Sequence, residues 1–229
     1  MEILSFEVLP STNLYACQNF DTIKDGQIVL AKMQTSGRGR KERVWLSDKG
    51  GLYFSLVVKP KNFKIDFLGS LTQAMALSVL KTLQNLDAKA VLKWPNDILC
   101  EGKKICGILS QAVFKEGKLS GVVIGVGVNI AQEQIDSPKP AISLKMLGIK
   151  ADREDVLKNI INNFNVYYPQ VCTKGFKAIK EEFLKNFPFI NKEIKIIVDN
   201  KEFCGLCRGL DERGQLLLGS KVINIGDME

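Results

Sequence analysis

The sequence predicts an α+β fold: a mixed, largely antiparallel sheet with helices on one side, followed by a small β domain. Three observations lead to this prediction. The pairs Glu101-Gly102 and Glu116-Gly117 each stand between apolar runs, as hairpin turns that join antiparallel strands do. Residues 66–86 carry apolar side chains at helical spacing. From Glu193 onward the pattern changes to short apolar runs separated by turn residues.

The remaining elements follow in chain order. Ser11 or Thr12 can cap a short helix. Apolar strands are expected at residues 27–33 and at the run LYFSLVV that begins with Leu52. Two further helices are expected at residues 152–168 and 174–187. Turns at residues 199–200 and 211–214 then separate short strands, so we divide the chain into a main domain, residues 1–186, and a small β domain, residues 187–229.

Composition limits the chemistry and the location. The 229 residues include no His, which excludes Ser–His and Cys–His nucleophilic systems. No apolar run approaches the roughly 20 residues that span a bilayer, and the N-terminus lacks the pattern of a signal peptide. Six scattered cysteines do not form a disulfide framework, which favours a reducing cytoplasm. Cys204 and Cys207 form a C-x-x-C, but in a strand these positions face opposite sides, so a structural pair is favoured over a metal site.

The formal net charge of +7 suggests anionic partners. A nucleic-acid-binding protein is therefore one alternative. It is disfavoured because Lys and Glu are mixed throughout the chain and no basic stripe interleaved with aromatic residues is evident.

The run TSGRGRKERVW, from Thr35 to Trp45, is the most informative segment. Glycine loses more backbone freedom on ordering than any other residue. Arginine carries a permanent charge on a planar fork that suits carboxylate or phosphate. We expect a flexible loop that orders around an anionic ligand.

The second informative segment is KWPND, which begins at Lys93, followed by Lys104 in a strand with apolar neighbours. Long cations beside such surfaces are candidates for anion binding. The usual nucleotide signatures are absent, since Gly125 and Gly127 lack the third glycine of G-x-G-x-x-G and the Walker pattern is missing. These two glycines serve either close packing or a ligand.

Taken together, these segments resemble biotin protein ligase (biotin–acetyl-CoA-carboxylase ligase) over nearly the whole chain. The family's elements appear in order from Ser11-Thr12-Asn13 through GRGR at Gly37 and KWPND to the run GVGVN that begins at Gly125. The C-terminal run RGLDERGQLLL is similar to the family's small SH3-like domain, and the main domain would have the family's class II synthetase-like catalytic fold.

The resemblance implies that biotin and ATP, with Mg²⁺, give biotinyl-5′-adenylate, and that biotin is then transferred to a lysine of a biotin carboxyl carrier protein. Arg40 and Lys104 would act at the reacting carboxylate and phosphate, and Asp97 would receive or orient the incoming lysine. The biotin site would comprise Ser11, Thr12, Gln34, Gly37, Arg38, Arg40, Tyr53, Lys104, Gly107 and Gly125. The ATP site would comprise Arg40, Arg43, Trp45, Lys93, Lys104 and Asn129. For Ser11, a helix cap alone is the competing interpretation, and the metal ligands are not indicated.

Two departures from the family matter. Ten residues precede Ser11, which leaves no room for the DNA-binding domain of many bacterial members, so no DNA partner is expected. Ala141 stands near the place where the family can put a Trp over the adenylate. No membrane partner is expected, and a homodimer is left open. A lipoate or octanoyl transfer enzyme of the same superfamily is the nearest enzymatic alternative, disfavoured by the polar Ser11, Thr12 and Gln34.

Overall fold

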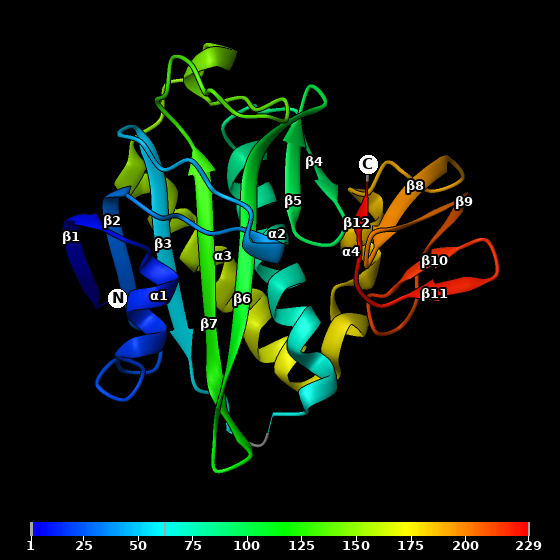
Figure 1. Cartoon of the computed structure of the whole chain (residues 1–229), viewed down its shortest axis with the longest axis horizontal. Helices are drawn as coiled ribbons and strands as arrows, with labels where there is room; N and C mark the ends of the chain where they lie inside the picture. The colour runs from blue at the N-terminus through cyan, green and yellow to red at the C-terminus, as the bar shows by residue number, and fades with distance from the viewer. Residues whose placement is uncertain (1, 62, 229) are drawn as a thin grey trace.

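The computed structural model describes residues 2–61 and 63–228, apart from the side chain of Glu42. Its main sheet has seven strands in the order β1-β2-β3-β7-β6-β5-β4 (Figure 1). The strands are β1 (Ile3–Leu9), β2 (Ile28–Gln34), β3 (Gly51–Val58), β4 (Ala90–Lys93), β5 (Asp97–Cys100), β6 (Lys103–Lys115) and β7 (Lys118–Asn129). Among the strands that the structure describes, only β1 and β2 pair in parallel, so the prediction of a mixed, largely antiparallel sheet is confirmed. β1 was not predicted from the sequence.

The two predicted hairpin turns are present. Glu101 and Gly102 join β5 to β6, and Glu116 and Gly117 join β6 to β7. All four residues have positive φ, between 49° and 74°, which is the conformation that two-residue hairpins require. The long β6–β7 hairpin brings Gly107 opposite Gly127 and Leu109 opposite Gly125, at the place where the sheet meets the candidate site.

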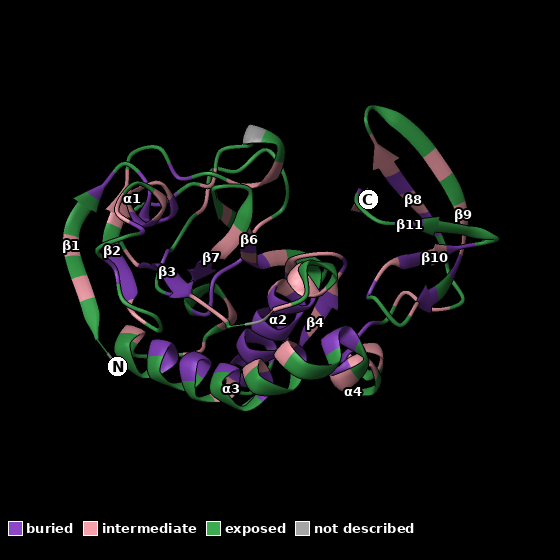
Figure 2. Ribbon diagram, turned by 90° about the horizontal axis from the view of Figure 1, so that it is seen from below, coloured by how far each residue is buried: buried purple, intermediate pink, exposed green. Residues whose placement is uncertain are grey.

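Helices cover both faces of this sheet. They are α1 (Thr12–Gln18), α2 (Leu68–Gln84), α3 (Arg153–Lys174) and α4 (Lys180–Lys185), with short 3-10 turns η1 (Arg40–Glu42), η2 (Ile65–Phe67), η3 (Lys145–Leu147) and η4 (Gly175–Ala178). Figure 2 shows α2 and α3 along one face and α1 on the other. The expectation of helices on one side is therefore wrong for α1, which is short and packs over β2 and β3.

The burial of alternate residues in β2 explains why helices cover both faces of the main sheet. In β2, Ile28 and Leu30 face the larger core beneath α2 and α3, whereas Val29 and Ala31 face the smaller core beneath α1. Alternate residues of a strand point to opposite faces, so an apolar run of this kind requires cover on both sides.

The helix boundaries near the end of the main domain differ from the prediction. α3 begins after its cap Asp152, whose Oδ1 accepts from Glu154 N (2.8 Å) and Asp155 N (3.0 Å). It continues past Pro169 to Lys174, six residues beyond the predicted end, because the buried stripe extends to Val171. The second expected helix, at residues 174–187, is divided into η4 and the short α4.

A small C-terminal β domain is also confirmed. Its five strands lie in the order β11-β10-β9-β8-β12. They are β8 (Glu193–Val198), β9 (Lys201–Leu210), β10 (Leu216–Leu218), β11 (Lys221–Ile223) and β12 (Asp227–Met228). All six cysteines are free, with Cys204 exposed and Cys207 buried on the opposite side of β9, as expected.

One carbonyl group of the β domain is hydrogen-bonded to two side chains of the main domain. Gly214 O accepts hydrogen bonds from Trp94 Nε1 (3.0 Å) and Gln73 Nε2 (2.9 Å), both of which are buried. Trp94 belongs to the KWPND segment, so the same turn that faces the candidate site also anchors the β domain. Within the described part of the chain, no helix combines the length and the apolar character needed to cross a membrane.

Candidate active site

A cavity of about 610 Å³ opens at the edge where the β2–β3 loop, the turn between β4 and β5, and strands β6 and β7 meet. This volume is typical of small-molecule sites. The start of α1 lines one end, and the arginine-rich loop and β12 line the other. The two ends differ in chemistry, and we describe them in turn.

One end is polar and buried. Ser11 caps α1 by accepting a hydrogen bond from Leu14 N (3.3 Å), which confirms the predicted cap. The next residue, Thr12, lines the cavity. Gln34 Oε1 accepts from both Thr12 N (2.8 Å) and Thr12 Oγ1 (3.1 Å). Ser55 donates to Asn13 Oδ1 (2.6 Å) and is fully buried. Buried polar groups persist where they are hydrogen-bonded, and here they form a fixed polar wall beside Gly125 of β7.

Gly125 and Gly127 pack closely against side chains and also face the cavity. They line the cavity, and a Cβ at Gly125 would lie 2.3 Å from Asn13 Oδ1. A Cβ at Gly127 would lie 2.3 Å from Trp45 Nε1. Only glycine allows these polar and aromatic side chains to lie against the sheet.

The arginine-rich loop, residues 35–47, is a small hairpin closed on itself. Trp45 N donates to Gly37 O (2.9 Å) and Gly39 N donates to Arg43 O (2.7 Å). Gln34 Nε2 donates to Ser47 Oγ (2.8 Å), which ties the base of the loop to the polar end of the cavity. The glycines thus serve the close approach of two backbone segments, and the arginines extend from the hairpin.

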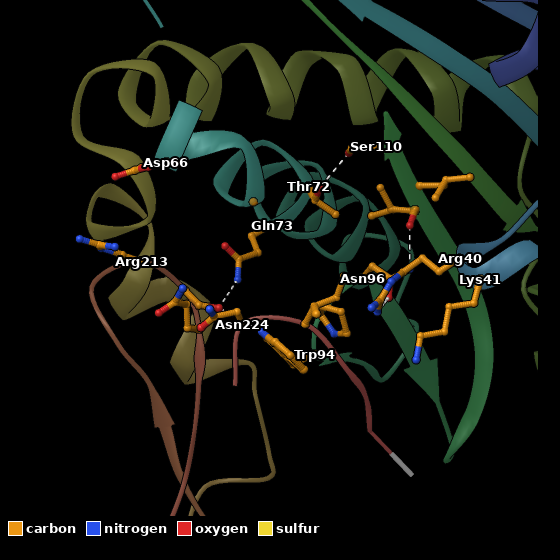
Figure 3. A pocket seen from close by; sticks show the side chains of 17 residues that line it. Arg40, Lys41, Asp66, Thr72, Gln73, Trp94, Asn96, Ser110, Arg213 and Asn224 are labelled. Atoms are coloured by element: carbon orange, nitrogen blue, oxygen red, sulfur yellow. Dashed lines mark hydrogen bonds between the residues drawn. The ribbon is translucent and has the colours of Figure 1, made fainter. Parts of the chain in front are cut away.

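Arg40 is the most constrained of these arginines (Figure 3). Its Nη1 donates to Asn96 Oδ1 (3.2 Å) and to Gly226 O (3.0 Å). Asn96 is itself held by donation from its Nδ2 to Ile108 O (2.7 Å). Burial lowers the pKa of the Arg40 guanidinium, although the carboxylates Asp227 and Asp97 oppose that shift. Among the described residues no atom accepts a hydrogen bond from the buried Nη2.

Lys104 and Asp97 form an ion pair in the lining of the cavity, with 2.7 Å between Nζ and Oδ1. The lysine Nζ also lies 5.1 Å from the centre of the Trp45 ring, within reach of a cation–π interaction. β5 and β6 bring these residues together, because Asp97 pairs with Gly107 and Lys104 with Leu99 across the bulged hairpin.

Twelve of the predicted site residues line this cavity: Ser11, Thr12, Gln34, Arg38, Arg40, Arg43, Trp45, Lys93, Asp97, Lys104, Gly107 and Gly125. Gly37, Tyr53 and Asn129 do not. Tyr53 is fully buried, donates to Asp48 O (2.8 Å) and accepts from Gln132 Nε2 (3.0 Å), and burial raises its pKa. Asn129 Nδ2 donates to Ile142 O (3.1 Å), which holds the segment after residue 137 over the cavity.

Asn13, Asn96 and Asp227 also line the cavity but were not among the predicted site residues, and neither was Ser55, which is hydrogen-bonded to Asn13. Asn13 and Asn96 adjoin predicted site residues, so their motifs carried a usable signal. Ser55 lies in the apolar strand β3, and Asp227 lies in the short strand β12 near residue 229. No local sequence pattern marks either residue as part of a site.

A second cavity of about 510 Å³ adjoins the first and shares Arg40 and Asn96 with it (Figure 3). It lies between α2, the turn after β4, and the β domain, with Gln73 and Arg213 on its walls. The first cavity has the lining to accommodate a small ligand with a polar, uncharged end and an anionic end.

Comparison with known proteins gives the family. The model of the biotin/lipoate A/B protein ligase family matches residues 5–129. The bifunctional ligase/repressor BirA of Bacillus spizizenii is 36% identical over 219 residues, which cover 90% of this chain and 66% of that protein. The biotin–[acetyl-CoA-carboxylase] ligase of Paracoccus denitrificans is 28% identical over 223 residues, which cover 91% of this chain and 90% of that protein. The chain therefore belongs to the biotin/lipoate A/B protein ligase family.

A solved structure extends the similarity beyond residue 129. The biotin protein ligase of Aquifex aeolicus in complex with biotin and ATP superposes with a TM-score of 0.86 at 27% identity, over 100% of this chain and 97% of that one. The chain spans about two thirds of the length of the bifunctional relatives from Escherichia coli and Bacillus.

Proposed function

We propose that this chain is an ATP-dependent biotin protein ligase. It joins the biotin carboxylate to the α-phosphate of ATP, with release of pyrophosphate, and then passes the biotinyl group to a lysine amine, with release of AMP. One observation carries the proposal: a single cavity has a buried, hydrogen-bonded polar wall at one end and the cations Arg40 and Lys104 at the other. Biotin has a polar ureido ring at one end and a carboxylate at the other, so it matches both.

The ureido ring of biotin occupies the end formed by Ser11, Thr12 and Gln34, beside Gly125. A ureido group offers both donors and an acceptor, and the amide and hydroxyl groups of this wall provide the complementary partners. Arg38 and Gly107 line the cavity along the ligand. Gly37 and Tyr53 act from outside the lining, by holding the loop and the strand in place.

The reaction takes place where Arg40 and Lys104 converge. A carboxylate attacking a phosphate brings two anions together, and preorganised cations offset their repulsion. The buried Nη2 of Arg40 has no hydrogen-bond partner among the described residues, so it can donate to a bound anion. Asp97, paired with Lys104, receives or orients the incoming lysine of the acceptor.

The nucleotide occupies the side of the cavity formed by Arg43, Trp45 and Lys93, with the indole against adenine. Asn129 supports this side through the carbonyl of Ile142. Among the described residues no cluster of three acidic, Cys or His side chains is suited to a metal. Mg²⁺ is commonly bound through substrate phosphates and one or two carboxylates, so we expect it to arrive with ATP. When bound, it would neutralise phosphate charge.

The acceptor is a biotin carboxyl carrier domain. The five-stranded order of the C-terminal domain supports an SH3-like barrel for residues 187–229. A cytoplasmic enzyme without a DNA or membrane partner, as a monomer or homodimer, is consistent with this function.

One assay tests the proposal. Pyrophosphate release from ATP is measured with biotin, with lipoate and with neither. We expect pyrophosphate release with biotin only. When a carrier domain is then added, its mass should increase, whereas the mass of its Lys→Arg variant should stay the same. Release with lipoate but not biotin would support the lipoate-transfer alternative that the family also contains. The absence of pyrophosphate release with both biotin and lipoate would refute a ligase.

A further inference from the structure

One carboxylate at the end of the chain faces three cations of the arginine-rich loop. Asp227 Oδ1 lies 3.6 Å from Arg40 Nη1, and Oδ2 lies 3.4 Å from Lys41 Nζ. Arg43 Nη2 also contacts Oδ2. The Asp227 side chain is only 11% exposed and that of Arg40 16%, so this pair interacts with little solvent screening, whereas Lys41 and Arg43 are more exposed. Without this carboxylate the three cations would repel one another at the tip of the loop.

The position of Asp227 is set by the β domain and not by the loop. Asp227 pairs with Ile197 and Met228 with Ile196 in the edge pair of β12 and β8, and the Met228 side chain is buried. The preceding Gly226 passes so close to the sheet that a Cβ would lie 2.7 Å from Ile196 Cγ2. A packed strand thus carries the carboxylate to Arg43 of the loop, 184 residues away along the chain.

The contacts of Arg40 divide between its two terminal nitrogens. Nη1 faces three oxygens, those of Asn96, Gly226 and Asp227. Nη2 is buried and has no acceptor among the described residues. A guanidinium is planar and rigid, so the acceptors on one nitrogen determine the direction in which the other nitrogen points.

We propose that Asp227 is a positioning residue that orients Arg40 and keeps the arginine-rich loop against the cavity. Its role rests on the proposed function, because Arg40 Nη2 is the donor presented to the reacting carboxylate and phosphate. The C-terminal β domain thereby contributes to the adenylation step through one side chain. Because the cluster holds three cations and one carboxylate, it keeps a positive charge for the anionic ligand.

The first test is a double-mutant cycle on biotin-dependent pyrophosphate release. Asp227→Asn keeps the size of the side chain and removes its charge. We expect kcat to fall about 10- to 100-fold, as misplacement of a catalytic group by about 1 Å can do, while KM for biotin stays within about twofold. In an Arg40→Ala background the same substitution should change kcat by less than about twofold, because groups that act through one another are not additive.

The matched control is Glu212→Gln. Glu212 is also a carboxylate of the β domain, and it pairs with Lys180 of the main domain at 2.6 Å, away from the cavity. We expect it to leave kcat unchanged. Equal losses from Asp227→Asn with and without Arg40, or no loss at all, would overturn the proposal.

The second test does not depend on activity. Trypsin cleaves after Arg and Lys, and the loop carries four such residues between Arg38 and Arg43. We expect cleavage in the loop of the ligand-free protein to be several-fold faster in Asp227→Asn than in wild type or Glu212→Gln. Equal cleavage rates would refute the proposal that Asp227 keeps the arginine-rich loop against the cavity. A wild-type protein that releases no pyrophosphate with biotin would instead overturn the proposed function, and the cleavage rates would still decide whether Asp227 holds the loop.

Discussion

Lys104 Nζ lies 2.7 Å from Asp97 Oδ1, so the lysine that faces the cavity is already paired with a carboxylate of the KWPND segment. The two residues occupy neighbouring strands of one hairpin, β5 and β6. An anion bound in the cavity and the Asp97 carboxylate would both interact with the ammonium group of Lys104. The pair therefore links binding of the first substrate to the carboxylate assigned to the second step.

Lys104→Ala should lower biotin-dependent pyrophosphate release at least about 100-fold, since loss of one preorganised charged donor costs this much in comparable sites. The free energy of unfolding should change by less than about 1 kcal/mol, because both side chains of the pair are partly exposed. Steady-state kinetics and urea unfolding measure the two effects. Lys103→Ala, an exposed neighbour in β6, is the control and should affect neither. Intact kinetics with lower stability would make Lys104 a scaffold residue.

The contribution of Asp227 to stability should depend on pH. Burial by itself would raise the pKa of Asp227, but Arg40, Arg43 and Lys41 together lower it. The folded state therefore holds the ionised form more strongly than the unfolded state does, whose pKa is about 3.9. This stability is present at neutral pH and is lost as the pH falls below about 4.

Urea unfolding of wild type and Asp227→Asn should therefore show a difference in free energy that is constant between about pH 6 and 8 and shrinks towards pH 3. A difference that stays the same at pH 3 would contradict the ion-pair explanation.

Gly127→Ala should weaken binding of ATP more than binding of biotin. The new Cβ would lie 2.3 Å from Trp45 Nε1, so the indole must move away from β7. Isothermal titration of a non-hydrolysable ATP analogue and of biotin measures the two affinities. Gly69→Ala in α2 is the matched control, because a Cβ there meets no atom within 4 Å. Equal losses of both ligands would show that the substitution disturbs the whole cavity.

Ser55→Ala should lower both stability and biotin affinity. Ser55 is fully buried and donates to Asn13 Oδ1, which would lose this donor at a cost of about 1–3 kcal/mol. Ser78→Ala is the control: Ser78 is equally buried, but it donates to Ala74 O, a carbonyl already used within α2. We expect a lower unfolding midpoint and weaker biotin binding only for Ser55→Ala. An unchanged biotin affinity would restrict Ser55 to the core.

Local patterns predicted the local elements. The cap at Ser11, the two hairpin turns and the helix at residues 66–86 each depend on a few consecutive residues, and each is present in the structure. The same holds for Cys204 and Cys207, whose opposite exposure follows from strand alternation. Where local patterns compete with packing, the prediction was wrong: α3 continues past Pro169 because its buried stripe continues.

The family resemblance, the cationic loop and twelve of the residues that line the cavity could be predicted from the sequence, because these lie in short contiguous motifs. Three features became visible only in the folded chain: α1 covers the opposite face of the sheet, Ser55 completes the polar wall, and Asp227 contacts Arg40. Each of them joins residues that lie far apart along the chain. A contact between residues 40 and 227 depends on how two packed sheets lie against each other, and no periodicity within either segment encodes that arrangement.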